Sequence, residues 1–268
     1  MKFVSPAPAI FHLAQTRLVK NETEPFLEKI GAKKDNKFWT TDAPSDAEKL
    51  IEMAGRGCYR SWFPGMNANV TRVREGNKTY IENILKSRHG SVIEHAYDTF
   101  AIVGCSRVFT HEMVRHRLAN VSQESLRFVR LDELSAWFPD SFRLHEKADE
   151  LLSTFKETFE YLEDVQIKLA NLLDLDNLEN FAQKKKLTSA MRRLAPIGLA
   201  TGIVITSNHR NWRHMIEART SRHAEEEIRI VFADIAEILA NEYPNIYQDA
   251  RVQMVDAIPE VTFENSKI

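Results

Sequence analysis

Apolar residues recur at spacings of three and four in two long segments, a period typical of amphipathic helices. The clearest segment is 149–173, whose apolar stripe consists of Leu152, Phe155, Phe159, Leu162, Val165, Leu169 and Leu172. The second runs without a break from about Asn211 to Glu242 and is ended by Pro244; its stripe includes Ile228, Val231, Phe232, Ile235 and Ile238. We therefore expect two long helices in the second half of the chain.

Two shorter helices are expected in the first half. Ser45 followed three residues later by Glu48 has the spacing of a capping box, so a helix should begin there and run to about Gly55. The pattern over 78–88 predicts another helix, which ends near Gly90.

Strand patterns are few. Aromatic and β-branched residues over 97–103 predict one strand, and Val4, Ile10 and Phe11 indicate one or two more. A helix is expected over 108–117, and the polar stretch 118–130 reads as a loop. These elements do not alternate as repeated βαβ units, so the sequence predicts an α+β fold, mainly helical with a small sheet.

Bulk properties narrow the class of protein. The 268 residues are expected to form a single domain, 1–268. A net charge of -2 argues against a protein that coats nucleic acid, since such domains are usually strongly basic. No apolar run is long enough to span a membrane, the first residues do not resemble a signal peptide, and the two cysteines lack CxxC spacing. We therefore expect a cytoplasmic protein without a structural zinc site.

Arginines are concentrated in two places. The first cluster is Arg107, Arg115, Arg117, Arg127 and Arg130; the second is Arg192, Arg193, Arg210, Arg213, Arg219 and Arg222. A guanidinium matches the geometry of a phosphate group, so two clusters in a near-neutral chain suggest small phosphorylated ligands. The alternative for any single arginine is a surface pair with Asp or Glu, and for Arg219 and His223 the helical spacing alone favours a solvated face.

Other common site chemistries find little support. GxGxxG, GxxxxGK[ST] and HExxH are all missing from the sequence. The histidine pairs His89/His95 and His111/His116 do not fall one helical turn apart, so no metal site is expected. Cys58 and Cys105 both read as small buried residues rather than nucleophiles.

Several segments, in order, resemble the flavin-dependent thymidylate synthase family. RHRLANVSQES (115–125) matches the family signature of RHR, seven residues and Ser. AGRGCYRSW (54–62) and RHGSVIEHAYDTF (88–100) resemble upstream segments, and RRLAP (192–196) and NHRNWRHMIEARTSRHAEEEIR (208–229) resemble downstream ones. Together the matches cover roughly residues 50 to 230, so the family's α+β fold and its reductive methylation of dUMP to dTMP are expected here.

The resemblance also implies roles for individual residues. Expected FAD contacts are His89, Ser91, Arg115, His116, Arg117 and Gln123, joined from another subunit of a homotetramer by Asn208, His209, Arg210 and His214. Expected dUMP contacts are Glu112, Arg115, Gln123, Glu124, Ser125, Leu126, Arg127, Arg192 and Arg219.

Within this set Arg192 would hold the phosphate, and Arg219 would be the catalytic residue. Arg219 would face the uracil and stabilise negative charge at N3, since arginine stays protonated and planar. Methylenetetrahydrofolate would donate the carbon, and NADPH would be the reductant. Ser125 is assigned to binding because no base adjoins it.

Three positions depart from the family pattern, and rival functions stay open. Gln123 replaces a common Glu, Phe128 a common Tyr, and His214 an Asn found in some members. The nearest rival is transfer of a hydroxymethyl group to dUMP. A non-catalytic nucleotide- or RNA-binding module and a metal-dependent phosphohydrolase are rivals of other classes, and a helical scaffold with arginine-rich surfaces is the simplest alternative.

Overall fold

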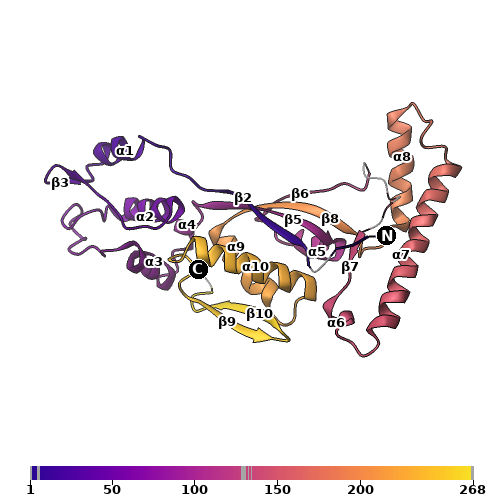
Figure 1. The fold of residues 1–268 in the computed structure, drawn as a ribbon. Coiled ribbons are helices and arrows are strands. Elements are labelled where there is room, and N and C mark those ends of the chain that lie inside the picture. Colours follow the sequence, from indigo (N-terminus) through magenta and orange to yellow (C-terminus); the bar gives the residue numbers. More distant parts are fainter. Residues whose placement is uncertain (1, 5–6, 128–130, 132, 134, 267–268) are drawn as a thin grey trace. The chain divides into compact units, whose positions relative to one another are not determined.

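A computed structural model describes residues 2–4, 7–127, 131, 133 and 135–266 (Figure 1). Phe128 and Arg130 lie outside the described residues. The chain divides into two compact units: unit 1 comprises 1–11, 100–205 and 225–231, and unit 2 comprises 12–99, 206–224 and 232–268. The expectation of a single domain stays a prediction.

A four-stranded sheet has the order β2-β5-β8-β6. Its strands are β2 (Ala9–Gln15), β5 (Tyr97–Ser106), β8 (Ala200–Asn208) and β6 (Asn120–Gln123). The strand predicted over 97–103 is confirmed and continues to Ser106. The loop predicted over 118–130 is wrong in part, because β6 lies within it; its Glu124 N–H donates to Gly202 O beside β8.

Unit 1 has a core of Leu131, Ala136, Phe159 and Leu199. Its further elements are β1 (Lys2–Val4), α5 (Arg107–Met113), β7 (Ser135–Trp137), α6 (Asp140–Arg143), α7 (Ala148–Leu172), α8 (Phe181–Met191) and the 3₁₀ helix η1 (Arg192–Leu194). β1 pairs with β7 in parallel. The long helix predicted over 149–173 is confirmed as α7; α8 runs beside it, and Gln166 Nε2 of α7 donates to Met191 O (Figure 1).

Unit 2 contains two of the predicted helices. Its elements are α1 (Thr23–Lys29), β3 (Lys33–Lys34), β4 (Lys37–Phe38), α2 (Asp46–Tyr59), α3 (Asn77–Lys86), α4 (Gly90–Ile93), α9 (His209–Thr220), most of α10 (Glu226–Glu242), β9 (Ala250–Val255) and β10 (Ile258–Phe263). Ser45 caps α2 as predicted, by accepting from Glu48 N at 3.2 Å. The helix continues past Gly55, and Arg60 ends it in the left-handed conformation.

The single helix predicted over 211–242 is wrong, because it is two helices. α9 ends at Thr220, and Ser221 is extended. α10 then begins with its own cap: the Glu225 carboxylate accepts from Glu227 N and Ile228 N. α9 packs on the β9–β10 hairpin, where Thr220 Oγ1 and Val261 N share a hydrogen bond of 2.9 Å.

Within the part of the chain that the structure describes, no helix is both long enough and apolar enough to cross a membrane.

Candidate functional site

In unit 1 the RHR sequence forms the turn that follows α5. Ser106 caps the start of this helix by accepting from Phe109 N at 3.2 Å. After Met113 the chain turns, with Arg115 N donating to Glu112 O. The turn leaves the two arginines of RHR exposed and its histidine half-buried. The sequence therefore places two cationic side chains, Arg115 and Arg117, where a ligand can reach them.

β6 and the turn after it are tied to α5 by two side chains. Gln123 Nε2 donates to Thr110 Oγ1 at 3.0 Å, and Arg107 Nη2 donates to Glu124 O at 3.0 Å. These contacts bring the signature segment 123–127 against α5. Inside the segment, Ser125 Oγ accepts from Arg127 N at 3.3 Å, so the Ser125 hydroxyl helps to shape the turn.

Arg107 is a candidate site residue that the motifs did not single out. Burial lowers the pKa of its guanidinium; Glu124 opposes this effect, and the neighbouring positive charge of Arg192 adds to it. Its Nε is buried and has no acceptor among the described residues. Two neighbouring guanidinium groups, one with an unused buried donor, suit an anion such as a phosphate monoester. Its place in the first arginine cluster was the signal available in the sequence.

A buried carboxylate anchors the start of α5. Glu227 is 1% exposed, and its two oxygens accept from Ser106 N at 2.6 Å and from Ser106 Oγ. Burial raises the pKa of Glu227 to about 7, although the Ser106 hydrogen bonds act in the opposite direction. Glu227 therefore links the first turn of α10 to the helix that precedes RHR.

Glu227 is expected to make stability fall as pH rises through the weakly acidic range. Its pKa in the folded state, about 7, is higher than the ordinary 4.5, so the folded state binds the proton more tightly than the unfolded state does. The stability that this tighter binding contributes is lost as the pH rises from 4.5 to about 7. A shift of one pKa unit corresponds to about 1.4 kcal/mol. Between about pH 5.5 and about pH 8 the free energy of unfolding of the wild type should therefore fall by about 2 kcal/mol more than that of Glu227→Gln. Urea unfolding of both proteins at the two pH values measures this difference.

Glu226→Gln is the matched control for this experiment. Glu226 is the preceding residue and accepts from Ser141 N at 2.9 Å, but it does not hold Ser106. Its pH dependence should follow that of the wild type. Equal pH dependence in the wild type and in Glu227→Gln would show that Glu227 is not the titrating group.

In unit 2 one set of predicted residues surrounds α4. His89 precedes this helix and stacks on Tyr59, with ring centroids 5.8 Å apart and the Tyr59 hydroxyl 3.1 Å from Nδ1. Ser91 is exposed on α4. Glu94, just after α4, forms a half-exposed ion pair with Arg210 of α9 at 2.5 Å. The structure thus connects the segment 89–94 with the start of α9.

The first turn of α9 carries three more predicted residues, of which one is buried. Asn208 caps the helix by accepting from Asn211 N at 2.9 Å. Arg210 is half-exposed, whereas His209 is 0% exposed and lies with Nε2 3.0 Å from Asp98 Oδ2. The imidazole of His209 therefore does not face a ligand. Further along α9 lie two more predicted site residues: His214 is exposed, and Arg219 is half-buried.

The second arginine cluster does not act as one surface. Arg213 is buried, and its guanidinium binds both oxygens of Asp249 at 2.7 and 3.0 Å. Arg222 pairs with Glu260 at 2.9 Å. The buried ion pair removes Arg213 from the candidate phosphate ligands, and Arg222 forms the kind of surface pair that was the alternative interpretation. Arg192, Arg193, Arg210 and Arg219 stay candidates.

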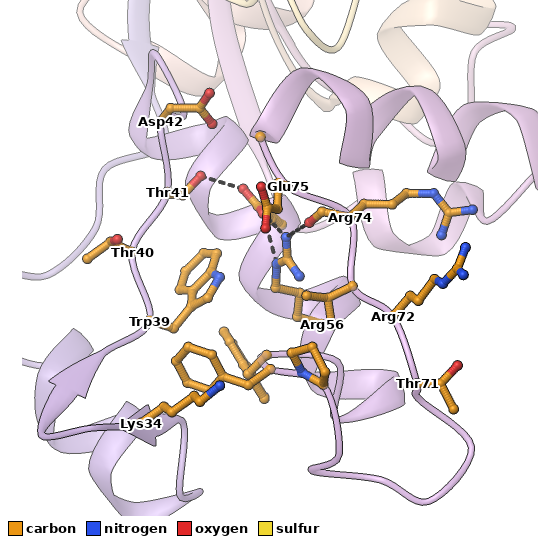
Figure 2. A pocket seen from close by; sticks show the side chains of 16 residues that line it. Lys34, Trp39, Thr40, Thr41, Asp42, Arg56, Thr71, Arg72, Arg74 and Glu75 are labelled. Carbon is orange, nitrogen blue, oxygen red and sulfur yellow. Dashed lines mark hydrogen bonds and ion pairs between the residues drawn. The ribbon is translucent and has the colours of Figure 1, made fainter.

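Unit 2 also contains a cavity of about 720 Å³, lined by segments 39–42 and 71–76 and by α2. Figure 2 shows Arg56 beside Trp39 at its floor, and Arg56 is held by Glu52 and by Arg74 O. The side chains of Arg72 and Arg74 extend away from that floor (Figure 2). Arg56 and Trp62 of the motif-like segment 54–62 line this cavity, but none of the described residues predicted to contact FAD or dUMP does, so the cavity is kept apart from the candidate site.

The cysteines differ from each other. Cys105 is buried as expected, and burial raises its pKa to about 12, so its thiol is a poor nucleophile at neutral pH. The expectation of a buried Cys58 is wrong, because this residue is exposed at the end of α2. Over the described ranges, no group of three or more His, Cys, Asp or Glu side chains is arranged to hold a metal ion.

Comparison with known proteins places the whole set of segments in one family. Residues 41–245 match the family described as thymidylate synthase complementing protein. Flavin-dependent thymidylate synthase of Mycobacteroides abscessus is 35% identical over 216 residues, 79% of this chain and 82% of its own length. That of Mycobacterium tuberculosis is 34% identical over 244 residues, 86% of this chain and 92% of its own length.

Solved structures support the fold. A UMP/dUMP methylase from Streptomyces cacaoi, bound with 5-Br dUMP, gives a TM-score of 0.62 at 16% identity over 92% of this chain and 96% of that one. Thymidylate synthase X of Helicobacter pylori with FAD and dUMP gives a TM-score of 0.54 at 22% identity, over 75% of this chain and 93% of that one. The predicted α+β fold is confirmed, and this chain belongs to the flavin-dependent thymidylate synthase family.

Proposed function

We propose that this protein methylates dUMP to dTMP with FAD as its cofactor, methylenetetrahydrofolate as the carbon donor and NADPH as the reductant. Family membership supports the reaction. The observation that carries the proposal in this chain is the guanidinium pair of Arg107 and Arg192, beside the signature segment 123–127. We further propose a homotetramer; the expected cytoplasmic location stays a prediction.

The dUMP residues are those of the α5–β6 region with Arg192 and Arg219. A nucleoside monophosphate brings a dianion, for which Arg107 and Arg192 supply charge and an unused buried N–H. Gln123, fixed by Thr110, retains an amide oxygen that can accept. The remaining dUMP residues of the proposal are Glu112, Arg115, Glu124, Ser125, Leu126, Arg127 and Arg219.

The donors of this chain fit FAD. Its two phosphates need cations and N–H groups, and Arg115, Arg117 and Arg210 all have solvent-accessible side chains. The proposed FAD residues are His89, Ser91, Arg115, His116, Arg117, Gln123, Asn208, Arg210 and His214. His209 is left out of this set because its side chain is buried. When bound, FAD supplies the redox chemistry.

Arg219 is the proposed catalytic residue. A methyl group can be added at C5 of uracil only when electron density moves toward that carbon. A fixed guanidinium at N3 stabilises the anionic form of the ring and so favours this shift. Cys105, with its raised pKa and buried position, does not suit attack on the ring, which agrees with a route without a cysteine nucleophile.

Arg192→Ala is expected to weaken dUMP binding. Loss of a charged hydrogen bond to phosphate costs about 1.5–3 kcal/mol, which is at least a tenfold rise in the dUMP dissociation constant. Calorimetric titration measures it. Arg193→Ala is the control because Arg193 is the next residue and is also exposed, but it does not belong to the proposed dUMP set. An unchanged dissociation constant for Arg192→Ala would remove Arg192 from the phosphate site.

A visible absorption spectrum tests the proposal as a whole. The purified protein, titrated with FAD, should carry flavin bands through gel filtration, and adding dUMP should shift them. This result would place the two ligands in one site. Protein that retains no flavin at any FAD concentration would overturn the proposal in favour of a nucleotide-binding module.

A further inference from the structure

Asp98 is a buried carboxylate, near the start of β5, that gathers side chains from β2, from α9 and from the residue that follows α10. Its Oδ1 lies 2.7 Å from Nε2 of His12 on β2 and accepts from the hydroxyl of Tyr243, after α10, at 2.6 Å. Its Oδ2 lies 3.0 Å from Nε2 of His209, the first residue of α9. Burial raises the pKa of Asp98, but the bonds from His209, Tyr243 and His12 outweigh burial and hold it below its usual value, so Asp98 is ionised at neutral pH.

The ring of His209 is enclosed by the protein. Its Nε2 faces Asp98, its Nδ1 lies 3.1 Å from the Tyr247 hydroxyl, and its edge packs on Tyr243 with centroids 4.5 Å apart. The histidine is therefore held in one rotamer and one place. Such a side chain can transmit the position of Asp98 to the helix that it begins.

Two hydrogen bonds to backbone oxygens also join the segment 94–98 to α9. His209 N donates to Ala96 O at 3.1 Å, and one turn later Trp212 Nε1 lies 3.4 Å from Asp98 O. The segment 94–98 thus meets the first turn of α9 through both main chain and side chains. Among these contacts, the Asp98–His209 pair is the one made by two fully buried ionisable groups.

The two residues that flank His209 are in the proposed flavin set. Asn208 is the helix cap, and Arg210 pairs with Glu94. We propose that Asp98 is a positioning residue for flavin binding: by holding His209 it fixes the first turn of α9 and so sets where Asn208 and Arg210 present their donors. This inference rests on the proposed function, since it requires that the first turn of α9 contacts FAD.

Three variants test the inference. Asp98→Asn removes the charge, and His209→Phe removes the link to α9 while keeping a ring between the two tyrosines. Tyr243→Phe is the matched control, because it removes the hydroxyl that donates to the same carboxylate and also contacts Gln15 Oε1 but keeps the ring that packs on His209 of α9. For each protein, FAD and dUMP dissociation constants are measured well below its melting temperature, which is recorded as well.

Asp98→Asn and His209→Phe should each raise the FAD dissociation constant about tenfold or more, and their double variant should be no worse than the stronger single variant. Tyr243→Phe should change FAD affinity less than about threefold, even if it lowers the melting temperature as much. The dUMP dissociation constant should stay close to the wild-type value in Asp98→Asn.

Other outcomes separate the two claims. FAD affinity that follows the melting temperature across all three variants, or that stays unchanged in the first two, would overturn the positioning role while leaving the proposed function intact. If either of the first two variants fails to fold, the other with Tyr243→Phe gives the same comparison. Wild-type protein that binds no FAD would contradict both claims.

Discussion

Arg219→Ala is expected to lower turnover of dUMP by about 100- to 1000-fold, the loss seen when one donor that stabilises developing charge is removed. Arg219 lies in the last turn of α9, well separated in sequence from the proposed flavin residues of the first turn. The variant should therefore keep most of its FAD. Turnover is followed by dTMP formation, and bound FAD by its visible absorption.

Arg222→Ala is the matched control for Arg219→Ala. Arg222 follows α9 by two residues and is engaged with Glu260 on the surface. Its loss should leave turnover within about twofold of wild type, since exposed ion pairs contribute little. Full activity in Arg219→Ala would remove this residue from the mechanism, and loss of FAD together with activity would reassign it to cofactor binding.

Asp249→Ala should destabilise the protein by about 3–5 kcal/mol, because it leaves the buried guanidinium of Arg213 without its counterion. The two side chains are 2% and 6% exposed. Burial raises the pKa of Asp249, but the opposite effect of Arg213 and Asn265 is larger and holds this pKa below its usual value. The carboxylate is therefore ionised in the folded protein. Urea unfolding followed by circular dichroism gives the free energy of unfolding.

Two further variants identify the cause of that loss. Glu82→Ala breaks the exposed Glu82–Lys86 pair and should cost less than about 1 kcal/mol. Replacing both buried partners, Arg213→Met with Asp249→Leu, should recover much of the stability, since no charge is then left unpaired. An Asp249→Ala protein as stable as Glu82→Ala would contradict the account of a buried ion pair.

The spacing of apolar residues predicted the helices that bury one face. α7 has a regular apolar stripe, and its predicted and observed ends agree within one residue. The break between α9 and α10 was not predicted, because residue spacing alone indicates one helix over 211–242. The break depends on Ser221 and on the Glu225 cap, and both are compatible with a helical pattern.

Strands proved harder to predict. β6 consists of polar residues apart from Val121 and becomes a strand by pairing within the sheet, which no local pattern records. β8 alternates regularly between buried and half-buried positions. Residues 200–208, ATGIVITSN, are rich in β-branched residues, which is the local signal for this strand.

For the site, motifs supplied residue types but not burial. They could not distinguish Arg213, which is neutralised by Asp249, from Arg192, which is exposed. Nor could they show that His209 faces inward or that Arg107 reaches Glu124. These facts depend on contacts between residues far apart in the chain, so they follow from the fold rather than from the motif.

The most direct test of the proposed function is the mass of the nucleotide product. Purified protein is incubated with dUMP, methylenetetrahydrofolate and NADPH, with and without FAD, and the nucleotides are separated and weighed by mass spectrometry. The account predicts dTMP, formed only when FAD is present. A hydroxymethylated nucleotide, or unchanged dUMP in a protein that binds FAD, would contradict it.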